Sequence, residues 1–449
     1  MTRVALLPSA YPPALGGVEE LTRHLALALV DAGDEVEVWT LHGDDSAPET
    51  VEVRDDLIVR RFPMPLPAGK WSSLYRSATI GPRTLFSLRN AIDAFRPDVL
   101  HVICFGPNGA YATVAARLAG LPLVVTLQGE TVMDDSDIFQ TSRTLKAALR
   151  RGIRSAAVVT GCSAFTLADA EERFGLAPGR GLVIPNGVDV DGAHTVPDGA
   201  SDARPVGSRT NVPTEETGPE TGPGAGAGAG AGAGSGAGSG PYPEPGPPER
   251  PYILALGRVV EKKGFDLLLT AYAGMDESLR TVDLVIGGAG PALEGLQASA
   301  RSFGLADRVH FAGRLSRPQV ARFMAGAELF VMPSRLEPFG IVVLEGWRAG
   351  VAVVATTRGG PPEFVRDGED GVLVDPFDTP GFSSALERLV SDDDWRRSIA
   401  AAGKARVDEF AWPVIAERYR AAYASVIPER GSQDRLERQL SPPRGESVS

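Results

Sequence analysis

The sequence predicts an α/β protein of two doubly wound parallel-sheet domains that face each other across a cleft. Short runs of Val, Ile and Leu alternate with helical segments of roughly 12–16 residues, which is the pattern of parallel strands buried on both faces. This alternation occurs twice, on either side of a segment of very different composition. The chain has 449 residues, 43% of them hydrophobic, so it can build two full cores.

The first predicted domain covers residues 1–190. Its strands are expected near 3–8, 35–40, 98–103, 122–127, 156–160 and 182–184. Helices fill most of the gaps between them, the first over Val18 to Ala32. At the end of the domain, Pro185 to Asp189 contains an Asn-Gly turn signal, which we interpret as a hinge rather than a catalytic segment.

The second predicted domain covers residues 251–410 and repeats the pattern. Its strands are expected near 252–256, 282–287, 309–311, 329–332, 351–355 and 372–374. A helix over Phe265 to Ala273 follows the first of them. A final helix is expected over 411–425.

The segment 191–250 separates the two domains. It contains 15 Gly and 10 Pro. Its large apolar side chains are too few to offset the entropy cost of ordering the chain, so we expect a flexible linker. The polar segment 426–449 is expected to be a disordered tail for the same reason.

Overall composition narrows the possible partners and the expected location. The net charge is −12 and the pI is about 5.1, which argues against nucleic acid as a partner. Cys104 and Cys162 lie in apolar, strand-like runs and are expected to be buried free thiols in a reducing compartment. No secretory signal or apolar run of membrane-spanning length is seen, so we expect a cytoplasmic protein.

The segment after the predicted strand 329–332 carries two glutamates, Glu337 and Glu345. Gly340 between them opens a predicted helix, so Glu337 lies in the strand-to-helix loop and Glu345 about one turn inside the helix. Both can face the space above the strand ends, where open α/β sheets bind ligands. The free N–H groups at the helix start favour an anion. The pair therefore suits a ligand with a diphosphate and many hydroxyls; two solvated glutamates are the alternative.

A basic loop follows the first strand of the second domain, from Gly257 to Gly264. Its glycines permit tight turns, and Arg258 and Lys263 can converge over the same crevice. Two cations beside a helix start can hold a diphosphate and neutralise the charge that it gains on departure. A solvated turn is the alternative for this loop taken alone.

Two glycine-rich turns have weaker interpretations. Gly16 and Gly17 precede the first helix, where exposed N–H groups could meet a phosphate or could form a plain capping turn. Gly288 and Gly290 fit part of a dinucleotide-binding pattern, but Leu293 breaks its spacing. A close approach to a nucleotide and a tight strand–helix turn both remain open there, and a nicotinamide oxidoreductase is disfavoured.

The helix expected over 141–154 carries a basic stripe formed by Arg143, Lys146, Arg150 and Arg154. Such a stripe can contact an anionic acceptor or a lipid headgroup surface at the inner face of a membrane, or can be a solvated helix face. The Asp and His residues show no spacing typical of metal ligands, so no metal and no cofactor are predicted.

Taken in order, five motifs resemble those of the GT-B retaining glycosyltransferases of family 4. They are Gly16-Gly17-Val18-Glu19, Pro185 to Asp189, Gly257-Arg258 with Lys263-Gly264, the Glu337/Glu345 pair, and Gly359 to Glu363 followed by Asp367, Gly368 and Gly371. The resemblance covers about 1–190 and 251–425. It implies two Rossmann-like domains, with the acceptor on the first and a nucleotide sugar on the second. It also implies that the final helix over 411–425 returns to the first domain.

The resemblance also implies roles for individual residues. Arg258 and Lys263 would bind the donor diphosphate, Glu337 the hydroxyls of the donor sugar, and Glu345 the ribose. The backbone N–H groups that would serve the sugar and phosphate belong to Phe339, Gly340 and Ile341, with Gly16 and Gly17 approaching from the first domain. Such enzymes usually need no metal. The acceptor, whether glycan, lipid or small molecule, is not identified by the resemblance.

Gln128 departs from the family pattern, which often has a histidine at this position. An amide can bind a sugar hydroxyl or phosphate but cannot take a proton near neutral pH. Gln128 and Glu130 are therefore candidates for contact with the acceptor or the sugar. The alternatives to sugar transfer are a nucleotide-sugar epimerase of the same architecture and a non-catalytic nucleotide-sugar-binding protein.

Overall fold

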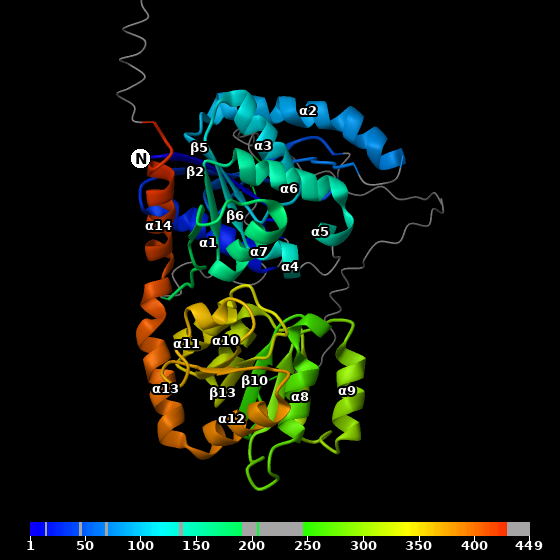
Figure 1. Ribbon diagram of the computed structural model, residues 1–449, viewed down its shortest axis with the longest axis vertical. Coiled ribbons are helices and arrows are strands. Elements are labelled where there is room, and N and C mark those ends of the chain that lie inside the picture. The colour runs from blue at the N-terminus through cyan, green and yellow to red at the C-terminus, as the bar shows by residue number, and fades with distance from the viewer. Residues whose placement is uncertain are drawn as a thin grey trace, which may run out of the picture.

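Two α/β domains lie one above the other, and the C-terminal helices run along one side of both (Figure 1). The computed structural model describes residues 1–13, 16–44, 47–67, 71–133, 138–190, 204–205 and 246–428. Each domain has one predominantly parallel sheet with helices on its faces. The predicted fold class is therefore confirmed.

The first domain contains a nine-stranded sheet in the order β8-β7-β6-β5-β1-β2-β4-β3-β9. Its strands are β1 (Arg3–Pro8), β2 (Glu35–Leu41), β3 (Thr50–Arg54), β4 (Leu57–Phe62), β5 (Val99–Ile103), β6 (Leu123–Leu127), β7 (Val158–Gly161), β8 (Gly181–Val183) and β9 (Arg204–Pro205). The central strand β1 pairs in parallel with both β2 and β5. Its residues Val4 to Leu7 are fully buried, as expected for a strand covered on both faces.

The sequence analysis missed the antiparallel hairpin of β3 and β4. Asp55 and Asp56 form its turn with φ of 51° and 60°. Asp and Asn tolerate this left-handed conformation better than most residues. β9 adds to the outer edge of β3 and lies within the predicted linker; the rest of 191–245 falls outside the described residues.

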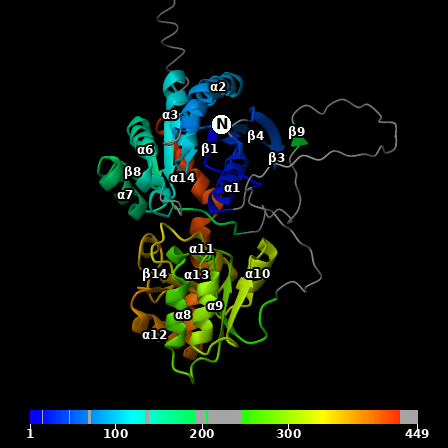
Figure 2. The ribbon, with the colours of Figure 1, turned by 90° about the vertical axis from the view of Figure 1, so that its right-hand side faces the viewer.

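The helices of the first domain are α1 (Gly17–Asp31), α2 (Trp71–Phe95), α3 (Pro107–Ala119), α4 (Glu130–Met133), α5 (Ile138–Thr141), α6 (Arg143–Ser155) and α7 (Ala164–Phe174). α2, α3 and α6 lie side by side on one face of the sheet, with α3 in the middle (Figures 1 and 2). Their apolar faces join one core cluster with the sheet. α1 covers the opposite face.

The second domain contains a six-stranded, all-parallel sheet in the order β12-β11-β10-β13-β14-β15. Its strands are β10 (Tyr252–Leu256), β11 (Asp283–Gly287), β12 (Val309–Gly313), β13 (Leu329–Met332), β14 (Ala352–Thr356) and β15 (Val372–Val374). Its α-helices are α8 (Phe265–Ala273), α9 (Leu293–Ser302), α10 (Arg317–Ala325), α11 (Ile341–Ala349), α12 (Thr379–Ser391) and α13 (Asp393–Arg406). Three short 3-10 helices are η1 (Glu261–Lys263), η2 (Pro361–Glu363) and η3 (Val407–Phe410).

The last helix, α14 (Trp412–Ala424), leaves the second domain and packs on α1 of the first. Its apolar side chains, including Tyr419 and Tyr423, belong to the core cluster that also contains residues of α1. Tyr423 Oη lies 2.7 Å from Nδ1 of the buried His101 on β5. Of the tail expected over 426–449, residues 429–449 lie outside the described part of the chain. No helix among the described residues is both long and apolar enough to cross a membrane.

Candidate functional site

The loops after β10 and β13 meet above the carboxyl edge of the second sheet, because these strands are neighbours in it. Lys263 Nζ, at the end of η1, donates to Oε2 of Glu337 at 2.7 Å. Ser334 Oγ donates to the same oxygen at 2.9 Å. Glu337 is buried, so two donors hold its carboxylate in place. Two predicted site residues, Lys263 and Glu337, are thus in direct contact, and Arg258 lies on the loop that contains Lys263.

Gly264 and Gly340 shape the backbone around this pair. Gly264 has φ of 66°, and a Cβ there would lie 2.0 Å from the carbonyl oxygen of Pro333, so only glycine lets the two loops approach so closely. Gly340 has φ of 93° and is the residue before α11. The start of α11, with the N–H groups of Ile341 and its neighbours, therefore lies four residues after Glu337.

Glu345 lies in the second turn of α11 and is linked to a different set of charges. Burial raises its pKa, and the guanidinium groups of Arg348 and Arg317 oppose that rise. Arg317, at the start of α10, also forms an ion pair with Glu20 of α1 in the first domain. Glu345 is therefore near an ion pair that spans the domains, whereas Glu337 is paired with Lys263.

Gly16 and Gly17 stand at the start of α1, where Gly17 is the first helical residue. A Cβ on Gly17 would meet nothing within 4 Å, so the space beside it is open. The carboxylate of Glu19 folds back towards Gly16, and a Cβ on Gly16 would lie 2.5 Å from its Oε2. A negative charge at a helix start is favourable, and the Glu19 carboxylate occupies this place. A phosphate bound there would have to displace the Glu19 side chain.

Gln128 and Glu130 lie after β6, on the first domain's side of the cleft. The two oxygens of Glu130 accept backbone N–H groups, from Phe105 and Gln128, each at 2.7 Å. Burial raises the pKa of Glu130 to about 7, while these hydrogen bonds favour the ionised form. Glu130 thus ties together the loops after β5 and β6. Nε2 of Gln128 is buried and has no hydrogen-bond partner within the described chain.

The start of α7 connects the two domains. The carboxylate of Glu363, from η2 of the second domain, accepts the N–H groups of Ala164 at 2.6 Å and Phe165 at 2.7 Å. Ser163 Oγ, before α7, donates to the carbonyl oxygen of Pro338 at 2.6 Å. An acidic side chain from one domain therefore satisfies a helix start in the other, which hydrogen bonding and the helix dipole both favour.

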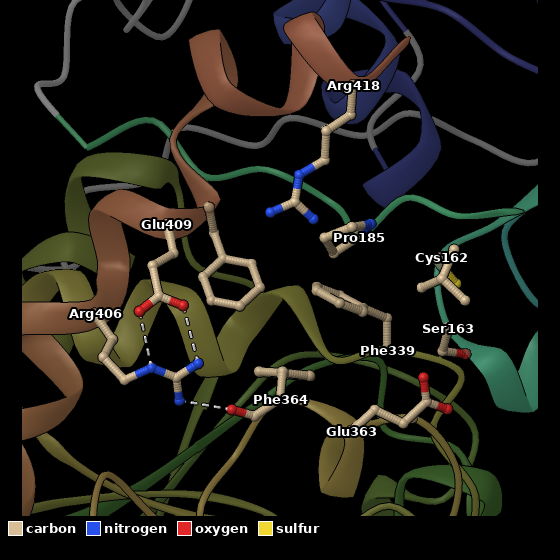
Figure 3. A pocket seen from close by; sticks show the side chains of 12 residues that line it. Cys162, Ser163, Pro185, Phe339, Glu363, Phe364, Arg406, Glu409 and Arg418 are labelled. Atoms are coloured by element: carbon tan, nitrogen blue, oxygen red, sulfur yellow. Dashed lines mark hydrogen bonds and ion pairs between the residues drawn. The ribbon is translucent and has the colours of Figure 1, made fainter. Parts of the chain in front are cut away.

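A cavity of about 250 Å³ lies between the domains beside these contacts (Figure 3). Its lining includes Ser163, Phe339 and Phe364, with Arg418 entering from α14 above. The Arg406 guanidinium below is paired with Glu409, with an Nε–Oε1 distance of 3.2 Å. Neither Lys263 nor Glu337 lines this cavity, and of the predicted donor-binding residues only Phe339 does.

The glycine-rich turn with Gly288 and Gly290 packs against the loop after β10. A Cβ on Gly288 would lie 1.8 Å from the carbonyl oxygen of Gly257, and one on Gly290 would lie 2.2 Å from that of Val259. These glycines therefore permit close packing between two loops. Within the described residues, no three His, Cys, Asp or Glu side chains gather as metal ligands would.

In the basic helix α6, Lys146 Nζ donates to the carbonyl oxygen of Gln140, and Arg150 donates to that of Arg173 at the end of α7. Arg143, Arg151 and Arg154 are exposed. Part of the predicted basic stripe is thus bound to neighbouring backbone.

Two family models match the chain over its two domains. The model described as "Glycosyl transferase 4-like domain" matches residues 16–187. The model described as "Glycosyl transferases group 1" matches residues 243–406. The chain belongs to the GT-B glycosyltransferases of family 4. It is therefore a glycosyltransferase, as its motifs predict.

Curated relatives of this glycosyltransferase act on different molecules. The lipopolysaccharide core biosynthesis glycosyltransferase LpsE of Rhizobium meliloti is 38% identical over 40% of this chain and 51% of its own length, about half of that relative. The D-inositol 3-phosphate glycosyltransferase of Xylanimonas cellulosilytica is 29% identical over 92% of this chain and 93% of its own.

Solved structures agree with the GT-B fold of this glycosyltransferase. Sucrose-phosphate synthase from Thermosynechococcus elongatus superposes with a TM-score of 0.67 at 20% identity, covering 95% of this chain and 99% of that one. Anabaena HepE in complex with UDP-glucose gives a TM-score of 0.65 at 18% identity, covering 95% and 100%. At these identities the likeness establishes the fold alone.

Sequence reasoning assigned no role to several residues that make contacts between the two domains. Glu363 was part of a motif, but nothing near it in sequence shows that its partners lie in the other domain. Ser163 carries a helix N-cap signal, which predicts the bond to Thr166 but not the bond to Pro338. Arg317 gives no local signal of its ion pair with Glu20.

Proposed function

We propose that this glycosyltransferase moves a sugar from a nucleoside diphosphate sugar to an acceptor hydroxyl, with retention of the anomeric configuration. The observation that carries the proposal is the Lys263–Glu337 ion pair beside the start of α11. One site thus offers a cation for a phosphate, a carboxylate for sugar hydroxyls and a helix start for further phosphate oxygens.

In the bound state, the donor diphosphate would pair with Lys263 in place of Glu337 and would also contact Arg258. Release from Lys263 would free acceptor positions on Glu337 for sugar hydroxyls. Backbone N–H groups from Phe339 to Ile341 would receive sugar and phosphate oxygens. The ribose would lie against Glu345, whose neighbours Arg317 and Arg348 favour its ionised form. Gly16 and Gly17 would face the phosphate from the other domain.

In the proposed reaction, the bond between the anomeric carbon and the diphosphate oxygen breaks, and its electron pair leaves with the diphosphate. The acceptor oxygen bonds to the same face of the oxocarbenium-like sugar, and its proton passes to the departing phosphate oxygen. Lys263, Arg258 and the start of α11 would stabilise the charge that develops on the leaving group. Because these groups supply the neutralisation, we include no metal ion in the proposal.

The contacts between the domains support a reaction that excludes water. Glu363 and Ser163 hold the second domain against α7, and Pro338, to which Ser163 donates, follows Glu337 directly. A closed cleft would suppress hydrolysis of the donor. Relatives named as GDP-mannose-dependent and a structural neighbour bound to UDP-glucose support a nucleotide sugar, but they differ in the base.

The test begins with thermal unfolding in the presence of a panel of UDP-, GDP- and ADP-sugars. A donor at about 100 times its Kd should stabilise the native state by about 2.7 kcal/mol. NMR of the product made with that donor then reports the anomeric configuration. Inversion would overturn the retaining mechanism. Conversion of the donor sugar without any acceptor would favour the epimerase.

A further inference from the structure

α2 presents large apolar side chains to solvent instead of to the core. Trp71 is 87% exposed, Tyr75 73% and Phe86 67%. At 3.6 residues per turn, these three side chains and the exposed Leu74 fall within one third of the helix circumference. Trp71, Leu74 and Tyr75 are neighbours on this face, and a monomeric protein rarely exposes a large apolar patch without a partner.

Arginines accompany this aromatic face, which we call the α2 surface: Trp71, Leu74, Tyr75, Phe86 and the arginines of α2. Arg76, Arg83 and Arg89 are all exposed. Asp93, whose carboxylate lies 3.4 Å from Nε of Arg89, is the only acidic residue within the sequences of α2, α3 and α6.

The neighbouring helices extend the positive charge. α6 lies in the same helical layer, with α3 between it and α2, and adds the exposed Arg143, Arg151 and Arg154 (Figures 1 and 2). The whole chain has a net charge of −12. The layer formed by α2, α3 and α6 therefore carries a net positive charge, opposite in sign to that of the whole chain.

We propose that the α2 surface docks on an anionic lipid bilayer. Aromatic rings with a polar edge favour the headgroup region, and a protein surface of this kind binds through buried apolar area plus attraction to anionic lipids. Trp71 and Tyr75 enter the boundary between headgroups and acyl chains, while Arg76, Arg83 and Arg89 contact lipid phosphates. The charge complementarity selects a lipid surface over a second copy of this chain, whose α2 surface is equally basic. The docking goes beyond the proposed reaction and does not depend on it.

The test is co-sedimentation of the full chain with vesicles of phosphatidylcholine alone or with about 30% phosphatidylglycerol. Sedimentation should need phosphatidylglycerol and should weaken as salt rises. Trp71→Ala with Tyr75→Ala should lower the partition coefficient at least tenfold, and each of Arg76→Glu and Arg83→Glu at least fivefold. Phe303→Ala and Arg301→Glu, which change exposed residues of the second domain, should leave it unchanged.

Tryptophan fluorescence gives a second readout. Trp39, Trp347 and Trp412 are buried and Trp395 is partly buried, so a blue shift on adding vesicles should report Trp71. Trp71→Phe should abolish the shift while the protein still sediments. The proposal is overturned if anionic vesicles do not sediment the protein, or if the α2 variants sediment like the wild type. The proposal would also be overturned if the lipid-free protein is a dimer and Trp71→Ala with Tyr75→Ala makes it monomeric, since the surface would then bind a second copy.

Discussion

Ser163 Oγ donates a hydrogen bond of 2.6 Å to the carbonyl oxygen of Pro338, and the two residues belong to different domains. The same hydroxyl accepts the N–H of Thr166 at 3.2 Å and so caps α7. Pro338 directly follows Glu337, whose carboxylate pairs with Lys263. One side chain thus joins a helix start in the first domain to the loop that carries the candidate donor site.

Ser163→Ala should therefore affect both stability and sugar transfer. Loss of the cap should cost about 1 kcal/mol of unfolding free energy, and the freed loop should slow transfer at least tenfold. Ser142→Ala is the matched control, because Ser142 caps α6 through the N–H of Leu145 at 3.2 Å. Denaturant unfolding and initial rates check both variants. Equal transfer rates for the two would refute a role of Ser163 beyond capping.

Glu363→Gln should loosen the contact between the domains. The N–H groups of Ala164 and Phe165 bond to different oxygens of the carboxylate, so in an amide held the same way one of them would face the NH2 group, which cannot accept. Hydrogen exchange at these two amides should accelerate at least tenfold, with little change in the centre of β1. Glu294→Gln, an exposed glutamate on α9, serves as the control. Unchanged exchange at Ala164 and Phe165 would contradict the interdomain cap.

Gly129→Ala should separate the domains at the cleft. Gly129 has φ of 87°, and a Cβ there would lie 2.2 Å from Cγ of Pro338. Gly120 has φ of 68° with nothing within 4 Å of an added Cβ, so Gly120→Ala carries the backbone strain without the clash. Both substitutions should cost about 1–2 kcal/mol of stability, but only Gly129→Ala should abolish transfer. Equal activity of the two variants would mean that the cleft does not need to close at Pro338.

His101 should make stability depend on pH. Burial lowers its pKa to about 3, and its ring nitrogens bond to Tyr423 Oη and, at 2.6 Å, to Thr126 Oγ1. Below the unfolded-state pKa of about 6.5, His101 binds a proton in the unfolded chain but stays neutral in the native protein. The free energy of unfolding should therefore fall by up to ~1.4 kcal/mol per pH unit as the pH falls towards 3.

A comparison with His101→Gln isolates this effect, because groups whose pH dependence of stability runs in the opposite direction are present in both proteins. Glu130, with its pKa raised to about 7 by burial, is one: its contribution is present below about pH 4.5 and is lost as the pH rises to 7. Denaturant unfolding between about pH 6.5 and pH 5 should show a steeper loss in the wild type than in the variant. Parallel curves would show that His101 is protonated in the native state.

The strand pattern was readable from the sequence because buried parallel strands are continuous apolar runs, such as Leu329–Met332. The hairpin of β3 and β4 was missed because its Glu and Arg residues, including the ion pair of Glu52 with Arg61, break the apolar pattern. Within the site, Lys263 and Glu337 could be placed together, since both lie on loops at the carboxyl ends of strands in one sheet.

The contacts of Ser163 and Glu363 could not be predicted. They depend on how the two domains are arranged, and no local pattern encodes that arrangement. Gln128 was singled out for its departure from a motif, but only the structure shows that its Nε2 is buried without a partner among the described residues.

Calorimetric titration with nucleoside diphosphates tests the donor site most directly. UDP, GDP and ADP would be titrated into the wild type, Lys263→Ala and Lys404→Ala, the last altering an exposed lysine on α13. We expect one of the diphosphates to bind, Lys263→Ala to weaken that binding at least tenfold, and Lys404→Ala to leave it unchanged. Undiminished binding to Lys263→Ala, or no binding of any of the three to the wild type, would contradict a donor site at Lys263 and Glu337.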